Sequence, residues 1–219
     1  MRGAVAERAL IFDFDGLILD TEWPEFQSVS EEFERHGVSL PLAEWRTVVG
    51  TAEHIHWLDW LDREVGGVLD REVAIARRRE RHHQLISERE VEAGVGELLE
   101  EADEAGIPLA VASSSPVDWV DGHLRRLGLR ERFGALRCRG DVAVTKPAPD
   151  LYLAAVAAVG ADPQRSVALE DSEHGCVAAK AAGMYCVAVP NDVTRGSSFE
   201  AADLVLDSLA ELSVSDLWP

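Results

Sequence analysis

Lysine is scarce in this chain. Of the 21 lysine and arginine residues among its 219, only Lys146 and Lys180 are lysines. A lysine kept in a sequence that otherwise uses arginine indicates a site that needs a compact ammonium group, which the planar fork of arginine does not replace. Lys146, in the segment TKPAPD at 145–150, is therefore a candidate functional cation.

Basic residues as a whole are outnumbered. The 40 aspartate and glutamate residues give the chain a formal net charge of −19 at pH 7. This charge argues against binding to nucleic acid, because phosphate backbones require a basic surface. Its simplest meaning is solubility. If the protein handles phosphate, it has to concentrate its few cations at one place.

Cysteine is also rare, and long apolar runs are missing. Cys138, Cys176 and Cys186 are odd in number and lack metal-type spacing, which is typical of reduced cytosolic thiols. No run reaches the roughly 18–20 apolar residues of a membrane span. The first residues carry charge where a signal peptide has its apolar stretch. We expect a cytoplasmic protein that binds no membrane and, by default, a monomer.

Short apolar runs alternate with helical patterns along most of the chain. Runs that predict buried parallel strands are 8–13, 107–112, 166–169, 184–189 and, more weakly, 203–207. Helical patterns that end at or before a glycine are 94–105, 117–127, 151–159 and 176–182. This alternation predicts an α/β fold with a doubly wound, Rossmann-like parallel sheet.

Residues 22–90 break the alternation, because they are helical in pattern throughout. Apolar residues at helix spacing are frequent there, and Trp23, Trp57 and Trp60 are large enough to fill a small core. The alternative use of these tryptophans is a platform for a substrate. We predict an α/β catalytic core of residues 1–21 and 91–219, with an all-α cap domain inserted at 22–90.

Polar residues follow three of the predicted strands. Asp13, Ser113 and the pair Glu170-Asp171 stand where their strands end. Ligands of doubly wound sheets bind beyond the carboxyl ends of the strands, so we expect these side chains to lie together. Asp13 and Asp15 also have the spacing of two carboxylates that share one site, one attacking phosphorus and the other carrying protons. Alone, the segment could be a turn rich in Asp and Gly.

Four segments taken in order resemble one family. They are Asp13-Phe14-Asp15-Gly16, Ser113-Ser114-Ser115, Lys146 with the Pro-Ala-Pro-Asp that follows, and Glu170-Asp171-Ser172 with Gly175. Together they resemble the haloacid dehalogenase superfamily of phosphotransferases, in the branch with a helical cap that includes beta-phosphoglucomutase. The resemblance covers nearly the whole chain.

The resemblance implies a role for each residue. Asp13 would be the nucleophile that accepts the phosphoryl group, and Asp15 the general acid and base. Ser113 and the backbone amide of Ser114 would hold the phosphoryl oxygens. Lys146 would pair with both nucleophile and phosphate, which opposes the repulsion between a carboxylate and a phosphate dianion.

The resemblance also implies a magnesium ion. Its ligands would be Asp13, the backbone carbonyl of Asp15, and Asp171, with Glu170 ligating or close by. Hard oxygen ligands suit that ion. The expected substrate is a small phosphorylated metabolite, either a sugar, a polyol or an acid phosphate.

Three functions are compatible with the family: a phosphatase, a phosphomutase and a member that only binds. The complete motif set argues against binding alone. The mutase has a histidine where this chain has Glu25, and an arginine where it has the loop 50–53. Glu25 and Glu53 would repel a phosphate, so we favour the phosphatase. Glu22, Glu25 and Glu53 are the expected specificity residues.

Other polar residues of the cap have simpler interpretations. His82 and His83 are adjacent, so on a helix they point in different directions and predict a solvated face. The arginines at 77–79 and 81 are expected on an exposed helix face, the alternative being attraction of an anionic substrate.

Overall fold

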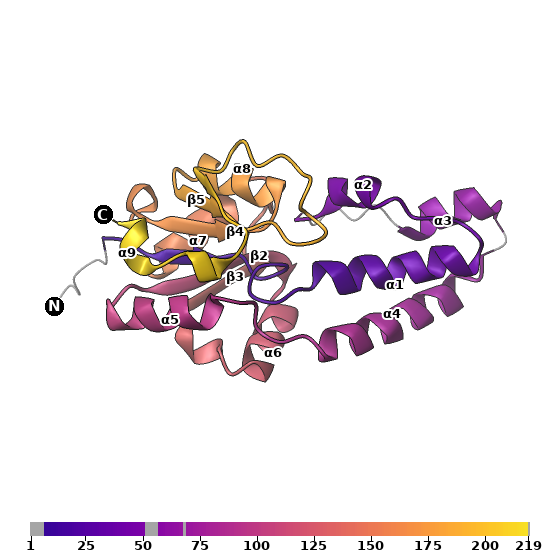
Figure 1. The fold of residues 1–219 in the computed structure, drawn as a ribbon, viewed down its shortest axis with the longest axis horizontal. Helices are drawn as coiled ribbons and strands as arrows, with labels where there is room; N and C mark the ends of the chain where they lie inside the picture. Colours follow the sequence, from indigo (N-terminus) through magenta and orange to yellow (C-terminus); the bar gives the residue numbers. More distant parts are fainter. Residues whose placement is uncertain (1–6, 51–56, 68, 219) are drawn as a thin grey trace.

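The computed structural model describes residues 7–50, 57–67 and 69–218. Within these ranges, six parallel strands form one sheet in the order β3-β2-β1-β4-β5-β6 (Figure 1). The strands are β1 (Leu10–Phe12), β2 (Leu109–Pro116), β3 (Ala135–Arg139), β4 (Val167–Glu170), β5 (Tyr185–Ala188) and β6 (Leu204–Val205). The order reverses at β1, as expected of a doubly wound sheet.

All five predicted strands are present. The sixth strand, β3, is one that the sequence pattern did not indicate. Its segment alternates arginine with smaller or apolar residues, and Arg139 at its end is exposed. β3 is an edge strand that pairs only with β2. It therefore lacks the continuous apolar run that marks the inner strands of a parallel sheet.

Helices cover both faces of the sheet. One face packs against α5 (Val95–Glu104), α6 (Val117–Arg126), η4 (Leu209–Glu211) and α9 (Val214–Leu217), and the other against α7 (Asp150–Ala158) and α8 (Glu173–Ala181). Single-turn helices η2 (Arg130–Arg132) and η3 (Pro163–Arg165) lie in the connections. Leu10 and Phe12 face the first set and Ile11 the second, as the period of a strand requires. The predicted fold class is confirmed.

The remaining helices extend from one end of the sheet (Figure 1). They are α1 (Glu22–Arg35), α2 (Leu42–Trp45), η1 (Arg46–Val48), α3 (Trp57–Val65) and α4 (Arg71–Ser87). The long helices α1 and α4 run side by side. Residues 51–56 of the predicted helical region lie outside the described residues. No helix in the described ranges is long and apolar enough to cross a membrane.

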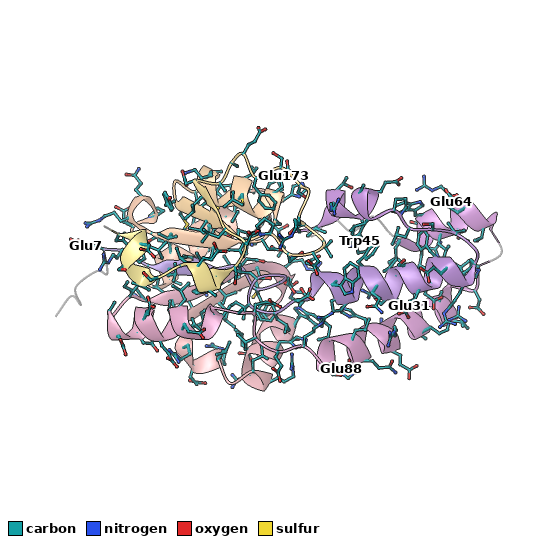
Figure 2. The ribbon with its side chains drawn as sticks, viewed as in Figure 1. Glu7, Glu31, Trp45, Glu64, Glu88 and Glu173 are labelled. Atoms are coloured by element: carbon teal, nitrogen blue, oxygen red, sulfur yellow. The ribbon has the colours of Figure 1, made fainter. Side chains whose placement is uncertain are left out.

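These helices have a hydrophobic core of their own. It is built around the buried side chains of Val29, Phe33 and Leu61, and Trp23, Trp57 and Trp60 pack against it, as predicted. The rings of Phe33 and Trp60 meet edge to face, with centroids 5.5 Å apart. Trp45, labelled in Figure 2, points from α2 toward Phe26 of α1.

Two short linkers join the helical region to the sheet. They run beside each other, because Leu19 and Val91 form a β-bridge and the Glu92 amide donates to the Ile18 carbonyl at 3.0 Å. A third connection comes from the single-turn helix η1, whose Arg46 Nε donates to the Val193 carbonyl at 2.6 Å. Val193 is fully buried in the hydrophobic core of the helical region, although it follows β5 in the chain.

We predict that this helical core can be weakened without unfolding the sheet. Phe33→Ala should lower the free energy of unfolding of the helices by about 3–5 kcal/mol, because it removes a fully buried ring. Hydrogen exchange followed by mass spectrometry should show faster exchange in α1 and α4 while β1 stays protected. The control, Glu34→Ala on the exposed face, should change stability by no more than about 0.5 kcal/mol. Equal loss of protection in β1 would contradict the prediction.

Candidate active site

A cavity of about 480 Å³ lies between the carboxyl edge of the sheet and the helical region. The sheet side supplies Asp13 and Asp15, which follow β1, together with Ser114 at the end of β2. The helical side supplies residues from α1, α2, α3 and α4. As predicted, the polar residues at the strand ends converge on one place.

Lys146 stands at the base of the site between two carboxylates. Its Nζ donates to Asp13 Oδ1 and to Glu170 Oε1, each at 2.5 Å, and only 2% of its side chain is exposed. The Tyr152 hydroxyl donates to the same Glu170 oxygen at 2.7 Å. The pKa of Lys146 is raised: burial acts to lower it, but the Asp13 and Glu170 carboxylates outweigh burial. The ammonium is therefore held charged.

Glu170 is fixed at its other oxygen as well. Oε2 accepts hydrogen bonds from the amides of Asp171 and Ser172 and from the Ser172 hydroxyl, at 3.0–3.2 Å. The Ser172 hydroxyl in turn accepts from the Gly175 amide and caps α8. A Cβ at Gly175 would lie 1.9 Å from the Glu170 carboxyl group, so the motif requires glycine at this position. Glu170 is a rigid support for Lys146.

The site contains more buried negative charge than positive. Asp13, Glu170 and Asp171 each offer an oxygen within 4.8 Å of the others, and all three residues are buried. Lys146 compensates only one of these charges. Burial raises the pKa of Asp13 to about 8 against the effect of Lys146, and burial and the Glu170 charge raise that of Asp171 well above its usual range. A set of hard, mutually repelling oxygens of this kind fits a small divalent cation.

Asn191 is a site residue that the sequence reasoning missed. Its Nδ2 donates to Asp171 Oδ2 at 2.7 Å and to the Gly16 carbonyl at 3.2 Å. Gly16 has φ +76°, and a Cβ there would lie 2.2 Å from Asp171 Oδ2. Asn191 follows β5, so its place at the end of an apolar run was the available signal.

Asp15 is held by two donors, one on each carboxylate oxygen. Trp119 Nε1 donates to Oδ1 at 2.8 Å, and the Ser113 hydroxyl donates to Oδ2 at 3.1 Å. The Ser115 amide donates to the Ser113 oxygen at 3.0 Å. Ser113 is thus where it was expected, next to the paired aspartates. Trp119 was missed, because a tryptophan in the first turn of a helix carries no motif.

Val49 and Gly50, which follow η1, reach the sheet edge. The Ser114 hydroxyl donates to the Gly50 carbonyl at 3.3 Å, and His174 Nδ1 lies 3.1 Å from the Val49 carbonyl. His174 therefore contacts the helical region from the first turn of α8. Glu53, expected to influence specificity, lies outside the described residues.

Glu22 and Glu25 both line the cavity from α1. Burial and the nearby Asp15 and Asp13 carboxylates raise the pKa of Glu22 to about 8. Glu25 contacts Arg78, and its Oε2 lies 3.2 Å from His82 Nε2. The expectation that Glu25 presents a repelling charge is wrong, because the guanidinium of Arg78 compensates it.

The expectation of a solvated face is also wrong for His82 and Arg78. Both line the cavity from α4 and are mostly shielded, with side chains 14% and 18% exposed. Burial, with the nearby Arg78 charge, lowers the pKa of His82 to about 3, so the ring is neutral at pH 7. Burial also lowers the pKa of Arg78 to about 10. The packing of α4 against α1 turns one stripe of α4 toward the cavity. The adjacency of His82 and His83 in the sequence did not show which of the two lies on that stripe.

The other polar residues of α4 agree with the prediction. His83 is exposed. Arg77 donates twice to the buried Glu32, at 3.1 and 2.9 Å, and Arg81 pairs with Glu31 at 2.9 Å. These arginines join α4 to α1 on the outer side.

A parallel α/β sheet with buried carboxylates at its edge and a helical region over them is the arrangement expected of a haloacid dehalogenase-like enzyme. The family model described as haloacid dehalogenase-like hydrolase matches residues 10–189. The chain belongs to this family, as the four motifs predicted.

Relatives match over nearly the full length of the chain. YhcW of Bacillus subtilis (strain 168) is 43% identical over 208 residues, which are 95% of this chain and 94% of that protein. Hexitol phosphatase B of Escherichia coli (strain K12) is 32% identical, over 95% of this chain and 96% of its own. Two crystal structures of CbbY from Rhodobacter sphaeroides are also similar, one in complex with phosphate and one of a mutant in complex with xylulose 1,5-bisphosphate. Each is 33% identical to this chain and covers 95% of it and 98% of the CbbY chain, with TM-scores of 0.76 and 0.77.

Gly16 provides a test of the carboxylate cluster. Gly16→Ala and Gly37→Ala should each lose about 1–2 kcal/mol of stability, because both glycines have positive φ. Only Gly16→Ala also crowds Asp171 and Asn191, since nothing lies within 4 Å of the Cβ position at Gly37. Gly16→Ala should therefore lose more stability than Gly37→Ala, and any thermal stabilisation by an added divalent cation should be smaller in Gly16→Ala than in Gly37→Ala. Identical behaviour of the two variants in denaturation with and without Mg²⁺ would contradict this account.

Proposed function

We propose that this hydrolase is a magnesium-dependent phosphatase that cleaves a small phosphomonoester through an aspartyl-phosphate on Asp13. The observation that carries the proposal is the pairing of Asp13 with a buried ammonium, Lys146, at the base of a cavity large enough for a small molecule. A carboxylate approaches a phosphate dianion only where positive charge offsets the repulsion. The relative named hexitol phosphatase B supports the same reaction class.

The side chains divide the reaction into two steps. Asp13 Oδ2, the oxygen that Lys146 does not contact, attacks phosphorus as the ester P–O bond breaks, and the Asp15 carboxyl group gives its proton to the leaving alkoxide. Water then attacks the aspartyl-phosphate, and the Asp15 carboxylate takes the proton of that water. The products are the alcohol and inorganic phosphate, and Asp13 is regenerated. We propose that Ser113 and Ser114 hold the phosphoryl oxygens.

Asp13, Asp171, the Asp15 backbone carbonyl and Glu170 are the proposed ligands of Mg²⁺. Bound there, the ion would neutralise charge and polarise the phosphoryl group. The described side chains already hold the acids in place: Asn191 orients Asp171, and Lys146 and Ser172 orient Glu170.

The cavity above these residues suits a sugar, polyol or acid phosphate. Its helical side offers the aromatic faces of Trp45 and Trp57 and the polar pair Glu25 and Arg78. In the described residues, the helical region presents no uncompensated cation to the cavity, since Glu25 offsets Arg78 and His82 is neutral. We propose that residues 22–90 form the cap domain, that 1–21 and 91–219 form the catalytic core, and that Glu22 and Glu25 take part in specificity.

Phosphate release is the direct test. Purified protein with Mg²⁺ should release inorganic phosphate from at least one member of a panel of small phosphomonoesters, and EDTA should abolish the release. Asp13→Asn should lower turnover by at least about 10³-fold, because an amide does not supply the nucleophilic oxygen.

The matched control for Asp13→Asn is Glu173→Gln. Glu173, labelled in Figure 2, is an exposed acid two residues from Asp171, and its replacement should leave turnover unchanged. Full activity after exhaustive chelation would contradict the proposed dependence on a metal. Full activity of Asp13→Asn would contradict the assignment of Asp13 as the nucleophile.

A second measurement separates phosphatase from phosphomutase. A mutase must retain a sugar phosphate and present its second hydroxyl to the aspartyl-phosphate, which requires cations in the cap. The only guanidinium that the described cap residues turn into the cavity is paired with Glu25. With beta-glucose 1-phosphate and a bisphosphate primer we expect free phosphate or no reaction. Primer-dependent formation of glucose 6-phosphate would show that the protein is a mutase.

A further inference from the structure

Trp119 joins the proposed proton carrier to the cap. It lies in the first turn of α6, on the sheet side of the cavity, and its indole N–H donates to Asp15 Oδ1 at 2.8 Å. An indole N–H donates only and cannot accept a proton. The Ser113 hydroxyl that donates to Oδ2 can also accept, so a proton on Asp15 is better accommodated at Oδ2 than at Oδ1.

The Trp119 ring is itself held from two sides. The His82 ring of α4 stacks on it, with centroids 5.6 Å apart and planes 12° from parallel. His123, one turn along α6, meets it edge to face at 4.3 Å and 70°. His123 also stacks on Phe14, the residue between the two aspartates, at 6.3 Å. Of these contacts, only the one to His82 crosses between the cap and the core.

His82 lies between the two long helices of the cap. Its Nε2, which has no hydrogen-bond partner in the described residues, lies 3.2 Å from Glu25 Oε2 of α1. The ring is neutral at pH 7, and its contact with Trp119 is an aromatic stack between two flat, mostly shielded surfaces. A cap that moves away from the sheet would remove this stack and leave the indole free to turn.

We infer that Trp119 is the positioning residue for Asp15, and that His82 of the cap keeps the Trp119 indole in the orientation that donates to Asp15. The inference rests on the proposed function. In the first step the proton on Asp15 Oδ2 goes to the leaving oxygen as the ester bond breaks; in the second, the carboxylate takes a proton from water. Both proton transfers require that the Asp15 carboxylate is oriented toward the reacting oxygen. Attack by Asp13 on an ester with a good leaving group has no such requirement.

The test uses Trp119→Phe, which keeps an aromatic ring and removes the N–H. With p-nitrophenyl phosphate and Mg²⁺, the burst of p-nitrophenolate that reports phosphorylation of Asp13 should keep its rate within about threefold, because this leaving group needs no proton. Steady-state kcat should fall about 10- to 100-fold, with KM changed less than about twofold, because activation of water fails. Disruption of the site in general would slow the burst as well.

Double-mutant cycles identify the path of the effect. Adding Trp119→Phe to Asp15→Asn should not lower the residual kcat further if Trp119 acts through Asp15. His82→Ala alone should lower steady-state kcat several-fold with the burst rate intact, and should have no effect in the Trp119→Phe background. His83→Ala, the exposed neighbour on α4, is the control and should match the wild type.

The outcomes separate the two proposals. A wild-type protein that releases no phosphate from any ester overturns the proposed function and this inference with it. An active wild type whose Trp119→Phe variant keeps its steady-state kcat overturns the inference alone, as do fully additive effects of Trp119→Phe and Asp15→Asn. If Trp119→Phe fails to fold, His82→Ala decides, and an unchanged kcat there overturns the inference.

Discussion

The ammonium of Lys146, buried among three carboxylates, is the interaction on which the sheet edge depends. Removing such charges from water is costly unless each finds partners, and breaking one pair leaves an uncompensated buried charge. The surrounding structure serves this requirement: Tyr152 and Ser172 donate to Glu170, and Asn191 donates to Asp171. The glycines at 16 and 175 bring the backbone close enough for these contacts. The negative charge that remains uncompensated favours a cation there, and a phosphoryl group would be repelled less once such a cation is bound.

The two sides of the cavity differ in their electrostatics. The sheet side concentrates charge that the protein does not neutralise, whereas on the cap side Arg78 and Glu25 offset each other and His82 is neutral. Under the proposed function, chemistry at the base would depend on net charge, while recognition in the cap would depend on hydrogen bonds and aromatic surface. The scarcity of lysine fits this division, because Lys146 is the buried cation of the base and Lys180 pairs with Asp203 elsewhere.

Sequence reasoning found the residues that a strand positions and missed those that packing positions. Asp13, Ser113 and Asp171 were predictable because the ends of parallel strands share one edge of a sheet. Trp119, Arg78 and His82 come from helices, and their contacts depend on how the helices dock, which no local pattern records. The strand at 135–139 was missed for a related reason, since an edge strand needs no continuous apolar run.

The burial of Val193 has a thermodynamic consequence for the cap. This side chain follows β5 but is fully buried in the cap's hydrophobic core, so a cap that swings open must expose apolar surface to water. Hydrophobic burial is driven largely by entropy near room temperature, carries a negative heat-capacity change and weakens on cooling. An equilibrium between closed and open forms of the cap would therefore depend on temperature. Warming through the moderate range would shift it toward closure, and cooling would shift it toward an open site.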